Sequence, residues 1–365
     1  MADLDDDHGV ESIRAYVRQH PDIDVHTYVK RGLNGLVYFG TRKKLKDEVV
    51  LKFYWSYPQF DSSEEAVILR AIDHPNVLKI HDLRFIKPNN AYFLSPFISG
   101  GDLQGHIDSR AISTREALRL ISGILAGVTE MHSNHGLVHR DLKPGNILLD
   151  IDRMHPIIAD LGAVKKIGTA DGYTSESKAT LYYLPPESIV DKRYYFQSDI
   201  YQVGIIMFQL LNGFFPINEP LKWLTAKEKK QLDAIVNGQK RFDFQEEAIK
   251  TKIYKGKLID TSTLPAYLDG SFKRVLNKAL HWDYTKRFKN ASEFLREVHR
   301  LSSTCPSYLW ESGQLLISHE SGTEYRITTK NGVHTLERKL PGKSWRKDNG
   351  HDGSFESILT VAREN

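Results

Sequence analysis

The most informative part of the chain runs His139-Arg140-Asp141-Leu142-Lys143-Pro144-Gly145-Asn146, with Asp160-Leu161-Gly162 a short distance beyond it. The Asp141 carboxylate can orient a hydroxyl group and accept its proton, and the Lys143 ammonium can neutralise charge beside it. Asn146 and Asp160 supply oxygen ligands of the kind that Mg²⁺ prefers, with ATP phosphates completing the shell. This combination predicts phosphoryl transfer to a hydroxyl group.

The segment resembles the catalytic loop of the eukaryotic-type (Hanks-type) protein kinases, and lysine followed by proline at Lys143 is typical of the serine/threonine-specific members. The resemblance covers roughly residues 25–300, with its motifs in order. It implies that Asp141 is the catalytic carboxylate and that Lys143 steadies the transferred phosphate. It also implies that Asn146 and Asp160 bind Mg²⁺, for which Mn²⁺ is an alternative, and that ATP is the phosphoryl donor.

Hydrophobic patterning predicts a strand-rich front and a helix-rich back. Strands are expected at Val25–Lys30, Leu36–Thr41, Val49–Trp55, Val77–Phe85 and Ala91–Phe97. Helices are expected at Ser63–Ile72, from Ser113 to about His132, and at Gln197–Asn212, Lys222–Val236, Gly270–His281 and Ala291–Leu301. The fold class is therefore α+β. The resemblance implies a bilobal protein-kinase-like fold, with a small β-rich N-lobe at 25–97 and a large helical C-lobe at 98–300.

Two segments lie outside this domain. Residues 1–24 are interpreted as a leader with a short helix before Pro21. Residues 306–365 are interpreted as a small β-rich appendage of unknown role, with strands at Leu315–His319, Glu324–Thr329 and His334–Arg338. The appendage is expected to pack on the kinase or to bind a protein partner. Basic residues around Trp345 raise nucleic-acid binding as a less favoured alternative.

Composition narrows the class of protein. Of the 365 residues 40% are hydrophobic and 26% are charged, as in soluble globular proteins, and the net charge of +4 is too small to indicate nucleic-acid binding. Cys305 is the only cysteine, which excludes an intrachain disulfide and a cysteine-based zinc site. The acidic N-terminus is not a signal peptide, and no apolar run is long enough to cross a membrane. We expect a cytoplasmic protein, with a secreted effector acting in a host cytosol as the alternative.

A nucleotide site is expected in the N-lobe. Gly32, Gly35 and Val37 match the end of the kinase glycine-rich loop, although Lys30 stands where its first glycine is usual. Lys52, in a strand resembling V-A-I-K, is expected to contact ATP phosphates. The resemblance implies an acidic partner for this lysine. Glu65 is favoured over its neighbour Glu64 because the spacing to Leu69 fits the family.

The segment from Phe93 to Asp102 resembles the hinge between kinase lobes. By register, the Pro96 carbonyl and the Ile98 backbone would face adenine, and the small Ser95 at the gatekeeper position predicts an open pocket behind it. Asp102 would bond ribose or cap a helix. The side chains that would sandwich the purine are Val37, Val50 and Leu148.

Residues 163–186 correspond to the activation segment of the family. Arg140, beside Asp141, is placed to pair with a phosphorylated residue of this segment. The candidates are Thr169, Thr174, Ser175 and Ser177. Thr180 is instead assigned to a contact with the catalytic loop, because it matches the family threonine that has this role.

Three further charges are expected to be structural. The resemblance implies that Glu187 pairs with Arg287 and that Asp199 holds the catalytic loop. Leu161 replaces the phenylalanine usual after the metal-binding aspartate, and packing is all its role requires. The resemblance then implies an apolar stack that joins the lobes, formed by Leu69, Ile80, His139 and Leu161.

The best interpretation is an active serine/threonine protein kinase that acts on protein substrates and autophosphorylates its activation segment. A pseudokinase scaffold is the alternative, and a small-molecule phosphotransferase of similar fold is a third. Lys222–Asp260 is rich in basic residues. It is interpreted as a solvated helical insert, with a docking surface for an acidic partner as the less favoured alternative.

Overall fold

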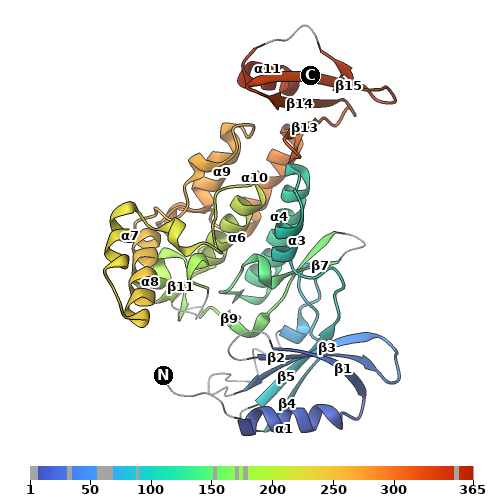
Figure 1. Ribbon diagram of the computed structural model, residues 1–365. Coiled ribbons are helices and arrows are strands. Elements are labelled where there is room, and N and C mark those ends of the chain that lie inside the picture. Colours follow the sequence, from blue (N-terminus) through green and yellow to red (C-terminus); the bar gives the residue numbers. More distant parts are fainter. Residues whose placement is uncertain are drawn as a thin grey trace.

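The computed structural model describes residues 7–30, 35–55, 69–87, 90–150, 154–168, 172–175, 180–348 and 353–364. Figure 1 shows a β-rich N-lobe, a helical C-lobe and a small β-rich unit at the far end of the C-lobe. Within the described residues, no helix combines the length and apolar character that crossing a membrane requires.

The N-lobe is built on an antiparallel sheet in the order β1-β2-β3-β5-β4. Its strands are β1 (Ile23–Lys30), β2 (Gly35–Arg42), β3 (Glu48–Trp55), β4 (Asp82–Lys87) and β5 (Asn90–Pro96). Side chains alternate between the two faces of a strand, so Val49, Leu51 and Phe53 of β3 are buried on one face while Lys52 projects from the other. This alternation directs Lys52 toward the C-lobe.

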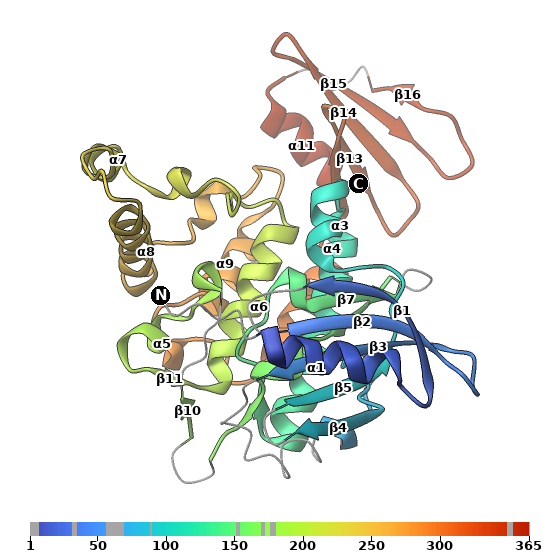
Figure 2. The ribbon, with the colours of Figure 1, turned by 60° about the horizontal axis from the view of Figure 1, so that its bottom comes forward.

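Helix α1 (Asp7–Arg18) covers the outer face of this sheet, as Figure 2 shows. Ile13 and Val17 are buried in the same apolar cluster as Leu51 and Tyr92. His20, which follows the helix, is buried and its Nε2 lies 3.1 Å from the Tyr92 hydroxyl. The helix expected in the leader is therefore present, and it forms part of the N-lobe core.

The strand expected at Val77–Phe85 begins only at Asp82. The segment before it is divided between two partners: Leu78 N–H donates to Ile158 O (2.8 Å) and Ile158 N–H donates to Asn76 O (2.8 Å) in the C-lobe, whereas His81 N–H donates to Leu94 O (2.8 Å) of β5. The expectation was wrong at this end because the extended backbone has a partner distant in sequence. Of the helix expected at Ser63–Ile72, residues 63–68 lie outside the described residues, and 69–71 are helical.

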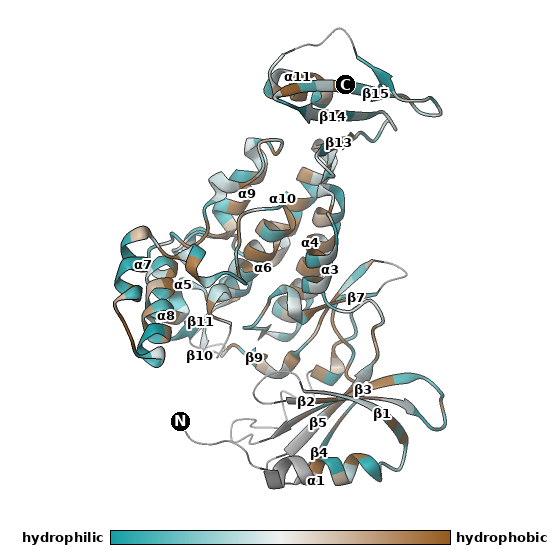
Figure 3. Ribbon diagram, viewed as in Figure 1, coloured by the Kyte–Doolittle hydropathy of each residue, from teal (hydrophilic) through white to brown (hydrophobic). Residues whose placement is uncertain are grey.

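The C-lobe is organised around α6 (Phe196–Leu210), which is buried along nearly its whole length. Around it lie α3 (Leu103–Ser109), α4 (Thr114–Thr129), α9 (Gly270–Ala279) and α10 (Ala291–Thr304). Hydrophobic residues, brown in Figure 3, are prominent on α6, whereas α7 (Ala226–Asp233) is mostly hydrophilic. Short strand pairs carry the catalytic segments: β6 (Leu137–Val138) with β9 (Lys165–Lys166), β7 (Ile147–Asp150) with β8 (His155–Ile158), and β10 (Thr174–Ser175) with β11 (Arg193–Tyr194).

The insert between α6 and α9 differs from the expectation. The prediction of a single helix at Lys222–Val236 was wrong. A 3₁₀ turn ends at Trp223, and a separate helix, α7, begins after Thr225, whose side chain accepts the Glu228 N–H. A second helix, α8 (Gly238–Tyr254), was not expected. It packs against α5 (Pro186–Val190) through Ile249 and Ile253, so the insert is folded onto the segment that follows Thr180.

The C-terminal unit is a five-stranded antiparallel meander with one helix. Its elements are β12 (Ser307–Glu311), β13 (Gln314–Ser318), β14 (Glu324–Lys330), β15 (Val333–Lys339), β16 (Arg346–Lys347) and α11 (Phe355–Glu364). The three expected strands are present, and β12, β16 and α11 are additional. The unit is fastened to the C-lobe, because Tyr308 N–H donates to Thr114 Oγ1 (2.9 Å) and the Arg363 guanidinium donates to Tyr267 O (2.6 Å).

Candidate active site

A cavity of about 600 Å³ lies between the two lobes. The three apolar residues expected around a purine, Val37, Val50 and Leu148, all line it. Behind Ser95 the lining continues with Leu78, Ile80 and Phe93, in keeping with the open pocket expected from a small side chain at that position. The polar end of the cavity holds Lys52, Lys143, Asn146 and Asp160.

The hinge residues line the other end of the cavity. Pro96, Ile98 and Asp102 all contribute to its wall. Asp102 also caps α3, with its Oδ1 accepting the Gly105 N–H at 2.9 Å. The helix-capping role, one of the two alternatives expected for Asp102, is thus present. Asp102 also lines the cavity, where the resemblance would place ribose. Of the glycine-loop residues, Gly35 opens β2 opposite Tyr54, and Gly32 lies outside the described residues.

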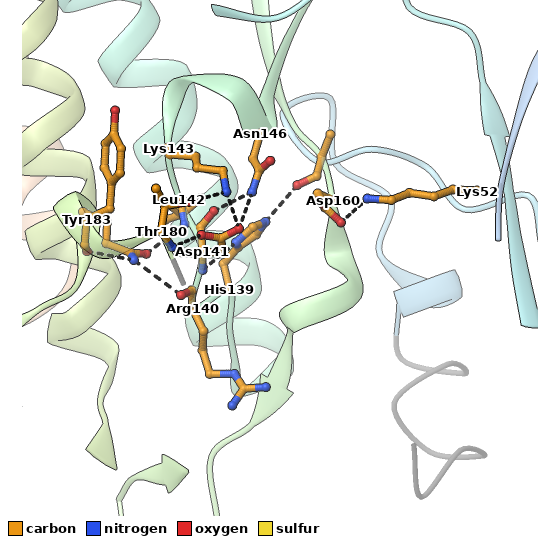
Figure 4. A network of polar contacts seen from close by, with 12 residues as sticks. Lys52, His139, Arg140, Asp141, Leu142, Lys143, Asn146, Asp160, Thr180 and Tyr183 are labelled. Atoms are coloured by element: carbon orange, nitrogen blue, oxygen red, sulfur yellow. Dashed lines mark hydrogen bonds and ion pairs between the residues drawn. The ribbon is translucent and has the colours of Figure 1, made fainter. Parts of the chain in front are cut away.

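Lys52 reaches from β3 to the Asp160 carboxylate and forms an ion pair with it, as Figure 4 shows. Asp160 is in the left-handed backbone region (φ 57°), which is costly for a residue with a side chain and is typical of functional sites. Burial alone would raise the pKa of Asp160, but the charge and hydrogen bond of Lys52, with His139 and Lys143, lower it below its usual value. The expected partner Glu65, like its rival Glu64, lies outside the described residues.

Asp141 is the centre of a polar network (Figure 4). Its Oδ2 accepts from Lys143 Nζ at 2.8 Å and from Asn146 Nδ2 at 2.9 Å. Thr180 closes the network: its hydroxyl accepts from Lys143 Nζ (2.7 Å), and its N–H lies 3.4 Å from Asp141 Oδ1. The contact expected between Thr180 and the catalytic loop is therefore present. Lys143 lies between a carboxylate and a hydroxyl, where it can hold an anionic group beside Asp141.

The donor set at the polar end fits a hard divalent cation. The Asn146 amide nitrogen donates to both the backbone O (2.7 Å) and the side chain of Asp141, so its carbonyl oxygen is the atom left for a metal. Asp160 adds a carboxylate in the same cavity. In the described part of the chain, no group of three or more His, Cys, Asp or Glu residues could hold a metal. One carboxylate and one amide suit Mg²⁺ that shares its shell with phosphates and water.

Asp199 on α6 holds the catalytic loop through the backbone. Its carboxylate accepts the N–H of His139 (2.8 Å) and the N–H of Arg140 (3.0 Å), and His132 Nε2 lies 2.8 Å from it. Burial would raise the pKa of Asp199, but His132 and His139 outweigh burial and lower it. Arg140 has a positive φ of 70°, and a charged acceptor for its N–H helps to maintain this backbone conformation.

Gln202 and Tyr194 support the same loop but were not expected from the sequence. Gln202 Oε1 accepts the Leu142 N–H at 2.8 Å, and the Tyr194 hydroxyl donates to Arg140 O at 3.1 Å. Gln202 follows Asp199 by three positions, so the two side chains lie on one face of α6. A polar residue three positions after Asp199, in an otherwise apolar helix, was the sequence signal that could have identified Gln202.

Arg140 also binds the activation segment directly. Its guanidinium donates to Ala163 O (2.6 Å) and to Ser175 O (2.9 Å). Among the candidate phosphorylation sites, Thr174 is buried and Ser175 is exposed, whereas Thr169 and Ser177 lie outside the described residues. Of the two described candidates, Ser175 is therefore the more accessible to solvent.

The expected ion pair of Glu187 and Arg287 is present and bidentate, with both N–O distances 2.8 Å. The exposed fractions of the two side chains are 3% and 0%. Glu187 ends the segment that starts at Thr180, so the pair anchors the backbone next to Asp141. Three members of the expected apolar stack, Leu69, Ile80 and Leu161, belong to one buried apolar cluster, and the fourth, His139, is buried with its Nε2 2.9 Å from Ala159 O.

Comparison with known proteins agrees with this geometry. The family described as protein kinase domain matches residues 24–298. A probable serine/threonine-protein kinase PknB of Lactococcus lactis is 33% identical over 277 residues, covering 75% of this chain and 39% of that protein. Calcium-dependent protein kinase 4 of Plasmodium berghei is 34% identical over 212 residues, covering 55% of this chain and 38% of that protein. The chain thus spans well under half the length of these relatives. Its match to the family over most of its length, together with the site described above, shows that the chain belongs to the protein kinase domain family.

Proposed function

We propose that this chain is an ATP-dependent serine/threonine protein kinase that uses Mg²⁺ and autophosphorylates its activation segment. The observation that carries the proposal is the placement of Lys52, Asp160 and Asn146 along one end of a cavity with apolar walls, with Asp141 bonded to Asn146 beside it. A purine fits between the apolar walls, and the phosphates would then extend toward the charged end. The names of the relatives, which are serine/threonine and calcium-dependent kinases, support the same activity.

In the proposed reaction the hydroxyl oxygen of a substrate serine or threonine attacks the γ-phosphorus of ATP. The bond to the β–γ bridging oxygen breaks, ADP leaves, and the hydroxyl proton passes to the Asp141 carboxylate. Lys143, which bonds both Asp141 and Thr180, is placed to neutralise charge on the transferred group. When bound, Mg²⁺ would neutralise the phosphate charge from a position held by Asn146 and Asp160.

Lys52 would exchange partners when the nucleotide binds. It contacts Asp160 directly in this structure, and a phosphate oxygen would compete for the same ammonium. The proposed roles of Pro96, Ile98 and Asp102 are contacts with adenine and ribose, because all three line the cavity. A signalling role in the cytosol fits a chain whose single cysteine forms no internal disulfide.

The test is transfer of labelled γ-phosphate from ATP and Mg²⁺ to the protein itself and to a generic basic protein, with Asp160→Ala and Asp233→Ala compared. Asp233 is an exposed carboxylate of α7 and serves as the control. We expect label on serine and threonine in the wild type and the control, and none in Asp160→Ala. If the wild type takes no label while ATP still raises its melting temperature, the chain is an ATP-binding scaffold and the proposal fails.

A further inference from the structure

A second hollow lies on the N-lobe, with a volume of about 410 Å³. Its lining residues are Arg42, Arg70, Lys79, Ile80 and His81. Arg42 ends β2, Arg70 belongs to the helical turn at 69–71, and Lys79 and His81 lie just before β4. Three segments that are far apart in sequence therefore bring three cations and a histidine to one concave surface. None of these four residues takes part in the proposed reaction.

The acidic residues around the hollow only partly balance these cations. Asp47 forms a two-bond ion pair with Arg42, and Asp73 lies 3.3 Å from Lys79 but has an exposed fraction of 88%. Within the described residues, Arg70 makes no ion pair and its side chain is exposed. Burial, with the charges of Arg42 and Lys79, lowers the pKa of His81 and so favours its neutral form. Among the residues that the structure describes here, a net positive charge therefore remains.

These side chains are suited to a phosphoryl group. A guanidinium can donate two parallel hydrogen bonds to phosphate oxygens, and a lysine adds a mobile point charge. The hollow is also large enough for more than a bare phosphate ion, since pockets of a few hundred Å³ hold small molecules. It has room for the side chain that carries a phosphoryl group.

The hollow and the ATP cavity share a wall. Ile80 lines both of them and is 4% exposed. Leu69, the neighbour of Arg70, is buried in the same apolar cluster as Ile80 and Leu161, and Leu161 follows Asp160 directly. A ligand that draws Arg70 toward Lys79 would therefore shift Ile80, whose side chain lines both the hollow and the ATP cavity. Binding at either site would then change affinity at the other.

We propose that this hollow is a phosphoryl-binding regulatory site whose occupancy alters nucleotide affinity in the cavity on the other side of Ile80. The ligand is either free phosphate or a phosphorylated side chain, which present the same dianionic group. Binding to the hollow goes beyond the proposed kinase activity and does not depend on catalysis.

The experiment titrates inorganic phosphate into phosphatase-treated protein at constant ionic strength, with a saturating, non-hydrolysable ATP analogue and Mg²⁺ filling the ATP cavity. Heat of binding gives the phosphate affinity. Arg70→Gln should weaken it about tenfold, the cost of one charge-assisted contact. Asp47→Asn should strengthen it, because Arg42 then keeps its charge without a competing carboxylate. Lys227→Gln, an exposed lysine of α7 in the other lobe, should change nothing.

Two results would overturn the site. One is an Arg70→Gln variant that binds phosphate as tightly as the wild type. The other is complete loss of phosphate binding once the nucleotide analogue fills the cavity, which would place the phosphate there. Asp160→Ala should keep phosphate binding, so a failure of the kinase proposal is distinguishable from a failure of this one. Repeating the titration on autophosphorylated protein separates the sources: reduced binding identifies a phosphorylated side chain of this chain as the ligand, and unchanged binding identifies an external phosphate.

Discussion

Replacing Arg287 with methionine would leave a buried carboxylate without its counter-charge. In the native structure the Arg287 guanidinium makes five hydrogen bonds. Two go to Glu187, at 2.8 Å each, and the others go to His281 O (2.7 Å), Gln197 O (2.9 Å) and Trp282 O (3.3 Å). Methionine preserves much of the side-chain volume but satisfies none of these acceptors. Glu187 would retain only Ser198 Oγ, at 2.5 Å, among the partners described for it.

The size of the effect follows from the burial of the pair. With exposed fractions of 3% and 0%, water cannot replace the missing guanidinium without rearrangement. Removing one member of a buried ion pair costs about 3–5 kcal/mol. For a chain of this size such a loss lowers the melting temperature by about 4–6 °C. Because Glu187 anchors the segment from Thr180, phosphoryl transfer should also fall more steeply than ATP affinity.

The assay is urea unfolding of wild type, Arg287→Met, Glu187→Gln and the double variant. The double variant should be more stable than the sum of the single losses predicts, by about 2 kcal/mol, because it leaves no unpaired charge. Lys222→Met is the control, since its pair with Glu219 is about half exposed and is worth about 0–1 kcal/mol. If Arg287→Met lost less than about 1 kcal/mol, or if the single losses simply added, the buried pair would not anchor the segment as argued.

Three other perturbations have defined outcomes. Asp199→Asn turns a donor toward the backbone N–H groups of His139 and Arg140, so kcat should fall about 10²-fold while the KM for ATP changes less than threefold, as steady-state kinetics would show. Burial first, and then the charge of Arg84, lower the pKa of His20 below 6.5, so the unfolded chain binds more protons there and stability falls as the pH drops below about 6.5. His20→Asn should reduce that loss between pH 7.5 and 5.5 in urea unfolding, and an unchanged slope would contradict the assignment. Arg363→Ala removes the bonds to Tyr267 O and the Tyr308 hydroxyl, so it should cost about 1.5–3 kcal/mol and speed amide exchange in β12.

The reacting groups could be identified from sequence because the chemistry requires particular atoms at nearly fixed spacing. Asp141, Asn146 and Asp160 were named from their motif, and the structure gathers them at one end of one cavity or beside it. The direction of Lys52 followed from strand alternation, a local property. Thr180 was assigned a contact with the catalytic loop, and that contact is present.

Other features depend on partners that a local pattern does not contain. Residues 77–81 have a strand-like sequence, but the backbone of Val77 and Leu78 pairs with Ile158 in the other lobe, and His81 N–H bonds to Leu94 of β5. Helix α8 buries few side chains, chiefly Ile249 and Ile253, so its periodicity is weak. The break before α7 comes from a capping hydrogen bond at Thr225, which interrupts a segment of otherwise helical composition. Backbone pairing with segments distant in sequence, and helix capping, determined where these elements begin and end.

The supporting contacts explain why the motif alone does not fix the geometry of the site. Asp199 and Gln202, both on the buried helix α6, hold the backbone N–H groups of His139, Arg140 and Leu142. Asp141 and Asn146 therefore move with the C-lobe. Lys52 moves with the N-lobe sheet, and it meets the C-lobe at Asp160. A change in the angle between the lobes would alter the Lys52–Asp160 contact and leave the Asp141–Asn146 bonds intact. The proposed phosphate position beside Lys52 is therefore the adjustable part of the site, and the groups proposed to react at Asp141 are held in its rigid part.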